Sequence, residues 1–242
     1  MKRIIIKLID FFAQLVLKRS SIYIFLKDRY FIKNDDHIFL TLYYIKEVLS
    51  SNPIIVDIGA ANGSFIDATK SVFSNFNLIG YEPLDDFYSI LKEKYKDNKN
   101  IIIHNAVVSD SFGSTILYKT NNNYSSSLLK PSNIVFQNVT LDKEINVSKR
   151  HLDADLRDLT NIDLIKIDVQ GAEKLILEQN IDTLKKTKFI LLEMSIVEQY
   201  SEGVLYYELD EFLRINGFTL INSFFNKFAM PEFDALYCNK LL

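Results

Sequence analysis

The chain has 242 residues, with 28 basic and 31 acidic side chains and a net charge of −3 at pH 7. This length suits one enzyme domain with an N-terminal extension and gives no reason to expect a second domain. The balanced charge, without a long basic block, argues against a nucleic-acid partner. Cys238 is the only cysteine, which excludes an internal disulfide and a thiolate zinc cluster and fits a reducing, cytoplasmic location.

The first 50 residues predict a helical extension. An amphipathic pattern covers residues 3–18, and a second helix is expected near 36–50. Lys7 and Asp10 interrupt the first apolar run and no small-residue cleavage site follows, so neither a signal peptide nor a transmembrane segment is predicted. We expect residues 1–50 to pack on the domain formed by residues 51–242 or on a second subunit, with binding to a membrane surface as the alternative.

A strand, a tight turn and a helix start are predicted over residues 54–65. Residues 54–58 are mostly apolar, and Gly59 and Gly63 frame a turn of small residues before a helix that begins at about residue 64. The start of such a helix offers free backbone N–H groups to a ligand. A second apolar run, residues 78–82, ends at Glu82, which follows Gly59 by 23 residues, a spacing typical of a ribose-binding carboxylate.

The spacing of the glycines indicates which cofactor binds. A dinucleotide site has Gly-x-Gly-x-x-Gly, which lets pyrophosphate approach bare backbone, whereas this turn reads Gly59-x-x-x-Gly63 with Asp57 two residues before it. The pattern favours S-adenosylmethionine, which has no phosphates but carries an amino-acid end suited to an acid and a helix start. An ordinary strand-to-helix connection explains the turn alone equally well, and Glu82 favours the cofactor. An NAD-type oxidoreductase and a non-catalytic cofactor-binding protein are the alternatives from other classes.

The alternation of strands and helices continues to the C-terminus. A helix near 85–96 and a strand over 101–107 complete a βαβαβ half. Residues 111–150 predict small strands and loops over one edge, with β-prone pieces at 115–118 and 134–136. The elements expected beyond them are strand 162–168, a helix from about Ala172, strand 188–193, helix 204–215 and a closing antiparallel pair at 218–221 and 235–238.

Several short motifs recur in the order and spacing of a known family. They are the turn at 57–63, Glu82-Pro83 and the segments 105–110, 164–173, 192–195 and 234–237. From Asp57 nearly to its end the chain resembles an FkbM-type methyltransferase, although Ala61 stands where the family's turn usually has Asn and Asn62 follows it. The resemblance implies an α/β class I (Rossmann-like) methyltransferase fold, with a seven-stranded, mostly parallel sheet, one antiparallel strand and helices on both faces.

The resemblance also implies that S-adenosylmethionine lies across the carboxyl ends of the first strands. Asp57 and Gly59 would line its amino-acid end, Glu82 would accept from both ribose hydroxyls, and Gly63 would leave room for the carboxyl end. Asn105 would meet the adenine edge or simply cap a turn. The predicted cofactor-binding residues are Asp57, Gly59, Ala60, Asn62, Gly63, Ser64, Glu82, Pro83, Asn105, Ala106 and Asp168.

A hydroxyl acceptor must lose a proton during methyl transfer, so a base is expected at the carboxyl ends of the central strands. Asp168 and Glu193 end the two candidate strands. Lys166 shares a strand face with Asp168, about 6–7 Å along the strand, and a lysine within a doubly buried strand is unusual. We predict that Asp168, Lys166 and Glu193 are catalytic, with a structural ion pair as the alternative for Lys166 and Asp168.

Two further segments complete the predicted site and its chemistry. Residues 125–127 are three serines that form a plain loop or, by the resemblance, part of the substrate wall. Residues 35–37 read Asp-Asp-His, which is ordinary helix capping, so no metal site is expected. The sequence therefore predicts an S-adenosylmethionine-dependent O-methyltransferase acting on a hydroxyl of a sugar or glycan precursor, as in polysaccharide biosynthesis. FkbM-type enzymes also serve natural-product pathways, which is the alternative.

Overall fold

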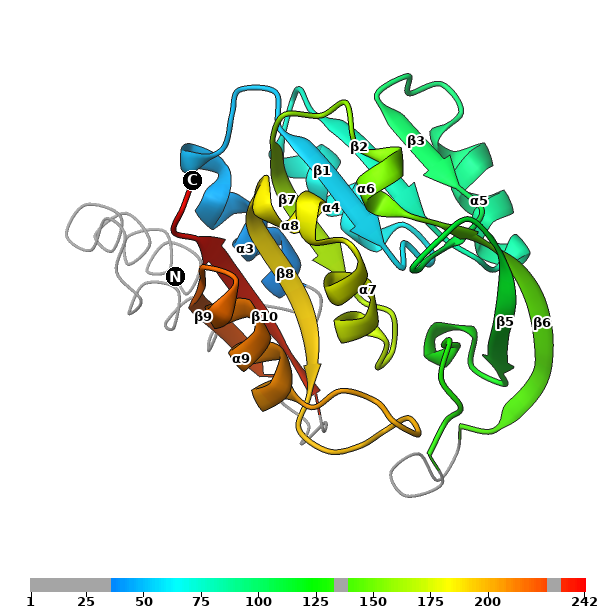
Figure 1. Ribbon diagram of the computed structural model, residues 1–242. Helices are drawn as coiled ribbons and strands as arrows, with labels where there is room; N and C mark the ends of the chain where they lie inside the picture. The colour runs from blue at the N-terminus through cyan, green and yellow to red at the C-terminus, as the bar shows by residue number, and fades with distance from the viewer. Residues whose placement is uncertain (1–35, 133–138, 226–231) are drawn as a thin grey trace, which may run out of the picture. The chain divides into compact units, whose positions relative to one another are not determined.

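The computed structural model describes residues 36–132, 139–225 and 232–242 (Figure 1). The predicted helix over 3–18 and the β-prone piece at 134–136 lie outside the described residues. The chain divides into two compact units, residues 1–41 and 42–242. Helix α3 (Asp36–Ile45) runs across this division and is followed by a short 3₁₀ turn, η1 (Lys46–Val48). No described helix has the length and apolar character needed to cross a membrane.

A seven-stranded sheet forms the centre of the second unit, and its strand order is β3-β2-β1-β7-β8-β10-β9. Neighbouring strands are parallel except that β10 runs antiparallel to both β8 and β9. This confirms the predicted mostly parallel sheet with one antiparallel strand. The strands are β1 (Ile54–Ile58), β2 (Asn77–Tyr81), β3 (Ile101–His104), β7 (Ile162–Ile167), β8 (Thr187–Ser195), β9 (Phe218–Phe225) and β10 (Glu232–Asn239).

Helices cover both faces of this sheet (Figure 1). Helices α4 (Ser64–Val72) and α5 (Asp85–Tyr95) lie on one face. The other face carries α6 (Leu152–Asp155), α7 (Glu173–Gln179), α8 (Ile181–Lys185) and α9 (Tyr206–Ile215), whose buried side chains join the main apolar core. Because helices cover both faces, every residue of β7 is buried, as expected for a central parallel strand.

A smaller sheet contains β4 (Val107–Val108), β5 (Gly113–Thr120) and β6 (Leu141–Arg150), in the order β4-β6-β5. It lies beyond the carboxyl ends of β1 to β3 (Figure 1). The predicted single strand over 101–107 is therefore wrong. The backbone turns after His104, whose carbonyl accepts from the Ala106 N–H, and Val107 then packs in a separate apolar cluster. His104 and Asn105 interrupt the apolar pattern at this turn, and the apolar residues on either side of them belong to different sheets.

A buried carboxylate fixes the amino-terminal end of β1 against β7. Asp163, which is 4% exposed, accepts hydrogen bonds from the backbone N–H of Ser50 at 3.2 Å, from its hydroxyl at 3.0 Å and from the Ile54 N–H at 2.9 Å. The sequence analysis did not predict this role for Asp163, because no motif marks an acid within an apolar run as a structural anchor. The contact explains why a charged residue is retained in a buried strand, since it pairs donors that the sheet leaves free.

We expect Asp163→Ala to lower the free energy of unfolding by about 2–4 kcal/mol, because two backbone N–H groups and a hydroxyl lose their acceptor. Urea denaturation followed by far-UV circular dichroism measures the change. The matched control is Asp158→Ala, which removes a carboxylate whose side chain is 94% exposed. The control should stay within about 0.5 kcal/mol of the parent protein. Equal losses in the two variants would contradict an anchoring role for Asp163.

Candidate functional site

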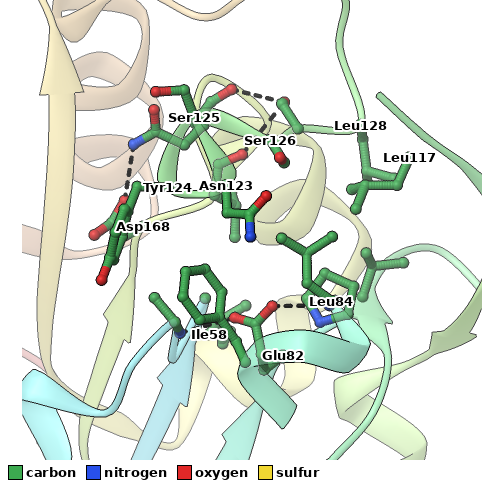
Figure 2. A pocket seen from close by; sticks show the side chains of 18 of the residues that line it. Ile58, Glu82, Leu84, Leu117, Asn123, Tyr124, Ser125, Ser126, Leu128 and Asp168 are labelled. Atoms are coloured by element: carbon green, nitrogen blue, oxygen red, sulfur yellow. Dashed lines mark hydrogen bonds between the residues drawn. The ribbon is translucent and has the colours of Figure 1, made fainter. Parts of the chain in front are cut away.

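A cavity of about 370 Å³ opens at the carboxyl ends of β1, β2 and β7. Figure 2 shows Ile58 and Glu82 on one side of it and Ser125 and Ser126 on the opposite side, with Asp168 at one end. The second group comes from a 3₁₀ turn, η2 (Asn123–Ser125), and the residues that follow it. The position agrees with the crevice expected at the carboxyl edge of an open α/β sheet.

The turn after β1 is pressed against the end of β7. Gly59 has a φ of +82°, and a β-carbon there would lie 1.9 Å from the carbonyl oxygen of Asp168. The Asp168 N–H in turn donates to the Ile58 carbonyl at 3.0 Å. Only glycine allows this approach. The same contact brings Gly59 and Asp168, both predicted cofactor residues, into the lining of the cavity.

The rest of the turn lies deeper or farther from the cavity. Gly63 has a φ of +83°, and a β-carbon there would lie 2.5 Å from the Tyr95 hydroxyl and 2.8 Å from Leu91 Cδ2, both on α5. The fold itself therefore requires a glycine at this position. Asn62 Oδ1 accepts from the Ser64 N–H at 3.1 Å. The residues that line the cavity do not include Ala60, Asn62, Gly63 or Ser64.

Glu82 follows β2 directly, is 4% exposed and lines the cavity. Its Oε2 accepts from the Ala61 N–H and its Oε1 from the Leu84 N–H, both at 2.8 Å. Burial raises the pKa of this carboxyl to about 7, although the two N–H groups oppose the shift. Each oxygen keeps a second lone pair, so the carboxylate can hold its loop and still accept from two hydroxyls. These acceptors fit the ribose of S-adenosylmethionine.

The predicted adenine end is mostly apolar. Pro83 and Ala106 line the cavity beside Leu84 and Phe87. Asn105 is not among the lining residues, and its Nδ2 donates to Asp85 Oδ1 at 3.0 Å at the start of α5. This contact joins two side chains and caps no backbone group, so the role of Asn105 stays a prediction.

A buried ion network lies beneath the turn. The Lys166 ammonium is 3.2 Å from Asp168 Oδ2 and 3.6 Å from Asp57 Oδ1, and it donates to the Gly59 carbonyl at 3.2 Å. Burial opposes its charge, but the carboxylates of Asp168 and Asp57 outweigh burial and raise the pKa of Lys166. Asp57 is fully buried, which raises its pKa to about 6 against the opposing effect of Lys166. Neither Asp57 nor Lys166 is among the residues that line the cavity.

Asp168 and Glu193 line the same end of the cavity and share one donor. Gln170 Nε2 donates to Asp168 Oδ1 at 3.1 Å and to Glu193 Oε2 at 2.6 Å. Burial acts against ionised Asp168, but Lys166 and Gln170 outweigh it and lower its pKa. Burial, followed by the charges of Asp168 and Glu232, raises the pKa of Glu193 well above its usual range. The two carboxyls therefore differ in their affinity for a proton.

Two placements at this end differ from the sequence analysis. Asp168 directly follows β7, which ends at Ile167, whereas the sequence predicted it as the last residue of the strand. Glu193 lies within β8, which runs to Ser195 beyond the expected end at 193. Ser125, Ser126 and Ser127 all line the cavity.

Sequence reasoning also missed several residues of the site. Glu232 lines the cavity from β10. Gln170 also lines it and lies in the motif at 164–173, but the sequence analysis assigned it no role. Glu173 Oε1 accepts from the Val169 and Gly171 N–H groups at 3.2 and 3.1 Å and thereby braces the loop after β7. Within the described ranges, no group of three or more His, Cys, Asp or Glu side chains is arranged to hold a metal ion.

Comparisons with known proteins agree with this geometry. Residues 57–220 match the methyltransferase FkbM domain family. The 2-O-methyltransferase NoeI of Sinorhizobium fredii (strain NBRC 101917 / NGR234) is 31% identical over 165 residues, which cover 64% of this chain and 68% of that protein.

Two solved structures of magnesium protoporphyrin IX methyltransferase (ChlM) from Synechocystis PCC 6803, one with S-adenosylmethionine and one with S-adenosylhomocysteine, share the fold. Each has a TM-score of 0.51 and 9% identity and covers 85% of this chain, with 78% and 81% of the respective ChlM chains covered. The chain therefore belongs to the FkbM methyltransferase family and has the class I methyltransferase fold. It is a methyltransferase, and its cofactor is S-adenosylmethionine.

Gly63→Ala tests why the turn requires glycine. We expect this variant to lower the free energy of unfolding by about 2–4 kcal/mol, because it adds a collision with Tyr95 and Leu91 to the strain of a positive φ. Gly217→Ala is the control, since its φ of +89° is similar but the nearest atom, 3.0 Å away, belongs to the exposed side chain of Leu241. The control should lose only about 1–2 kcal/mol. If the two variants unfold at the same urea concentration, the packing against α5 does not explain Gly63.

Proposed function

We propose that this FkbM-family methyltransferase transfers a methyl group to a hydroxyl of an uncharged sugar or glycan precursor. The observation that carries the proposal is the content of one cavity: a carboxylate suited to ribose at one side and a pair of carboxyls with divergent proton affinity at the end. S-adenosylmethionine supplies a methyl group that its sulfonium already activates, so the protein mainly has to align the acceptor and accept its proton.

The cofactor would lie along the side of the cavity formed by the turn after β1 and the segment after β2. Glu82 would accept from the ribose hydroxyls, while Pro83 and Ala106 would contact the base. Gly59 would face the amino-acid end. Asp57 would act from beneath through Lys166, 3.6 Å away, and not by direct contact.

The side chains around the rest of the cavity support a polar, uncharged acceptor. Hydroxyl and amide groups come from Asn122, Asn123, Ser125, Ser126, Ser127 and Gln170. Among the described lining residues, none is Lys, Arg or His, and Asp168, Glu193 and Glu232 are acidic. An acceptor with a phosphate or carboxylate beside the reacting hydroxyl would meet three acids without a cationic partner, which is unfavourable. A sugar hydroxyl flanked by other hydroxyls meets donors and acceptors instead.

The similarity to NoeI supports the choice of oxygen as the methylated atom, because NoeI is a 2-O-methyltransferase. A hydroxyl becomes a good nucleophile only as its proton leaves. We propose that Asp168, with its charge maintained by Lys166, orients the hydroxyl and takes its proton. Glu193 is the competing base, and its raised pKa makes its ionised form the stronger acceptor. In either case the acceptor oxygen gains the methyl group and the carboxylate gains the proton.

We predict that Glu82→Ala weakens S-adenosylhomocysteine binding by about 10- to 500-fold, because two charge-assisted hydrogen bonds are lost and water replaces them only in part. Calorimetry measures the dissociation constant. Glu93→Ala, on the exposed side of α5, is the control and should bind as the parent does.

The same measurement has a pH dependence with a defined sign. The pKa of Glu82 is about 7, and ribose donors need its ionised form, so affinity should rise about tenfold between pH 6 and pH 8. Glu82→Ala should lack this component. Unchanged affinity in the variant would remove Glu82 from the cofactor site.

The catalytic assignment is tested by turnover with a panel of neutral monosaccharides, oligosaccharides and non-sugar alcohols, with labelled S-adenosylmethionine as donor. Asp168→Asn should reduce turnover by about 10²–10⁴ while S-adenosylhomocysteine affinity is kept. Lys166→Met should also slow turnover and shift its pH dependence. If Glu193→Gln loses turnover while Asp168→Asn keeps it, the base is Glu193. Methylation of alcohols without methylation of any sugar would replace the glycan acceptor with a natural-product one.

A further inference from the structure

Gln170 adopts a backbone conformation that side chains rarely take. It lies in the loop between β7 and α7 with a φ of +61°, in the left-handed region. The Ser127 hydroxyl donates to its carbonyl at 2.7 Å, and the next residue, Gly171, has a φ of +95°. Such a conformation persists where the surroundings determine it. Here it directs the Gln170 side chain toward the end of the cavity, which Gln170 lines.

The amide of Gln170 is used at both ends. Its nitrogen has two hydrogens and can donate one to each carboxylate. The nitrogen lies 3.1 Å from Asp168 Oδ1 and 2.6 Å from Glu193 Oε2. Its Oε1 lies 2.8 Å from the hydroxyl of Tyr200, which is also 3.0 Å from the Ser125 carbonyl. A reversed amide would direct its oxygen at the ionised Asp168 carboxylate and leave that contact without a donor. The contacts therefore favour one orientation.

Tyr200 is well placed to hold that orientation. It is 2% exposed, and a β-carbon added to Gly171 would lie 3.1 Å from its ring, so the ring packs on the turn that carries Gln170. It comes from the segment between β8 and α9, whereas Ser125 comes from η2. The Tyr200 hydroxyl thus links two segments that are distant in sequence, through the Gln170 amide and the Ser125 carbonyl.

We infer that Gln170, oriented by Tyr200, is a positioning residue that holds the carboxyl groups of Asp168 and Glu193 in place for deprotonation of the acceptor. The inference rests on the proposed roles of these two acids. Gln170 does not itself take the proton, because an amide has no basic group in this pH range.

The charges around Glu193 explain why such a donor is needed. The groups that act on it from the neighbouring elements are Asp168 after β7, Glu232 and Asp234 on β10 and Glu173 on α7, together with the Tyr200 hydroxyl. The cation of the cluster, Lys166, pairs with Asp168 and Asp57. The two carboxyls already act on each other, and Gln170 supplies a donor to each of them, so removing the amide should strengthen their tendency to share one proton.

The test uses the full chain with S-adenosylhomocysteine and carboxyl-¹³C-labelled Glu and Asp. NMR follows the side-chain carboxyl signals against pH, and Glu193→Gln identifies the Glu193 signal. We expect Gln170→Met, which has a similar shape without donors, to raise the Glu193 titration midpoint by about one pH unit. Tyr200→Phe should move it in the same direction by less, because the amide remains but loses its orientation.

Tyr237→Phe is the matched control. Like Tyr200→Phe, it removes a buried tyrosine hydroxyl. This hydroxyl donates to Asp210 at 2.8 Å, and neither Tyr237 nor Asp210 lines the cavity. It should change stability and leave the Glu193 midpoint unmoved. A Glu193 midpoint that stays the same in Gln170→Met and Tyr200→Phe overturns the inference, even if both variants are less stable.

The result does not depend on which molecule is methylated, because no acceptor is present. A shifted midpoint together with failure of the whole acceptor panel would support the positioning role and reject the proposed acceptor. Normal turnover on a sugar together with an unmoved midpoint would do the reverse. Should Gln170→Met fail to fold, Tyr200→Phe alone decides, since it leaves the Gln170 backbone unchanged.

Discussion

The ammonium of Lys166 holds together the part of the molecule on which the site depends. It lies inside the sheet, 8% exposed, and contacts two carboxylates and the Gly59 carbonyl. A buried cation without partners would be strongly unfavourable, so these contacts have to form together. Their formation fixes the turn after β1 against the end of β7. Gly59 allows the turn to approach Asp168, and the contacts of Lys166 hold Asp168, Asp57 and the Gly59 carbonyl together at that point.

This arrangement gives neighbouring acids different properties. Asp168 faces Lys166 and accepts from Gln170, so its ionised form is favoured. Glu193 is on the next strand, away from the cation and among other acids, so its protonated form is favoured. Two carboxyls with opposite preferences at one end of a cavity suit the proton transfer that we propose for this site. Burial and pairing produce the difference, and no metal ion is needed to explain it.

The sequence predicted those features that depend on nearby residues. The turn from Asp57 to Gly63 and the acid at Glu82 follow from runs of apolar residues that end at fixed intervals, and their structure is local. The end of β3 was misplaced because Ala106 and Val107 resume the apolar pattern two residues after β3, although Val107 belongs to a second sheet. Composition cannot distinguish one long strand from two short strands that serve different cores.

The contacts of the cavity end were beyond the reach of sequence patterns for a different reason. Glu232 begins β10, which is inserted between β8 and β9 in the opposite direction, so the start of the strand meets Ser195 near the end of β8. Tyr200 and Ser127 reach Gln170 from loops 30 and 43 residues away in sequence. Nothing periodic relates these positions, since only the packing of three loops joins them.

The choice of an amide at position 170 follows from the same electrostatics. A lysine or arginine there would also donate to both acids, but its charge would lower the pKa of both and weaken whichever of them accepts the proton. An apolar side chain would keep Glu193 basic and leave two acids facing each other without a donor. Glutamine alone among these choices orients both carboxylates and adds no charge. Lys166 pairs with Asp168 and Asp57, so the donor to Glu193 has to come from another residue, and that is the role proposed for Gln170.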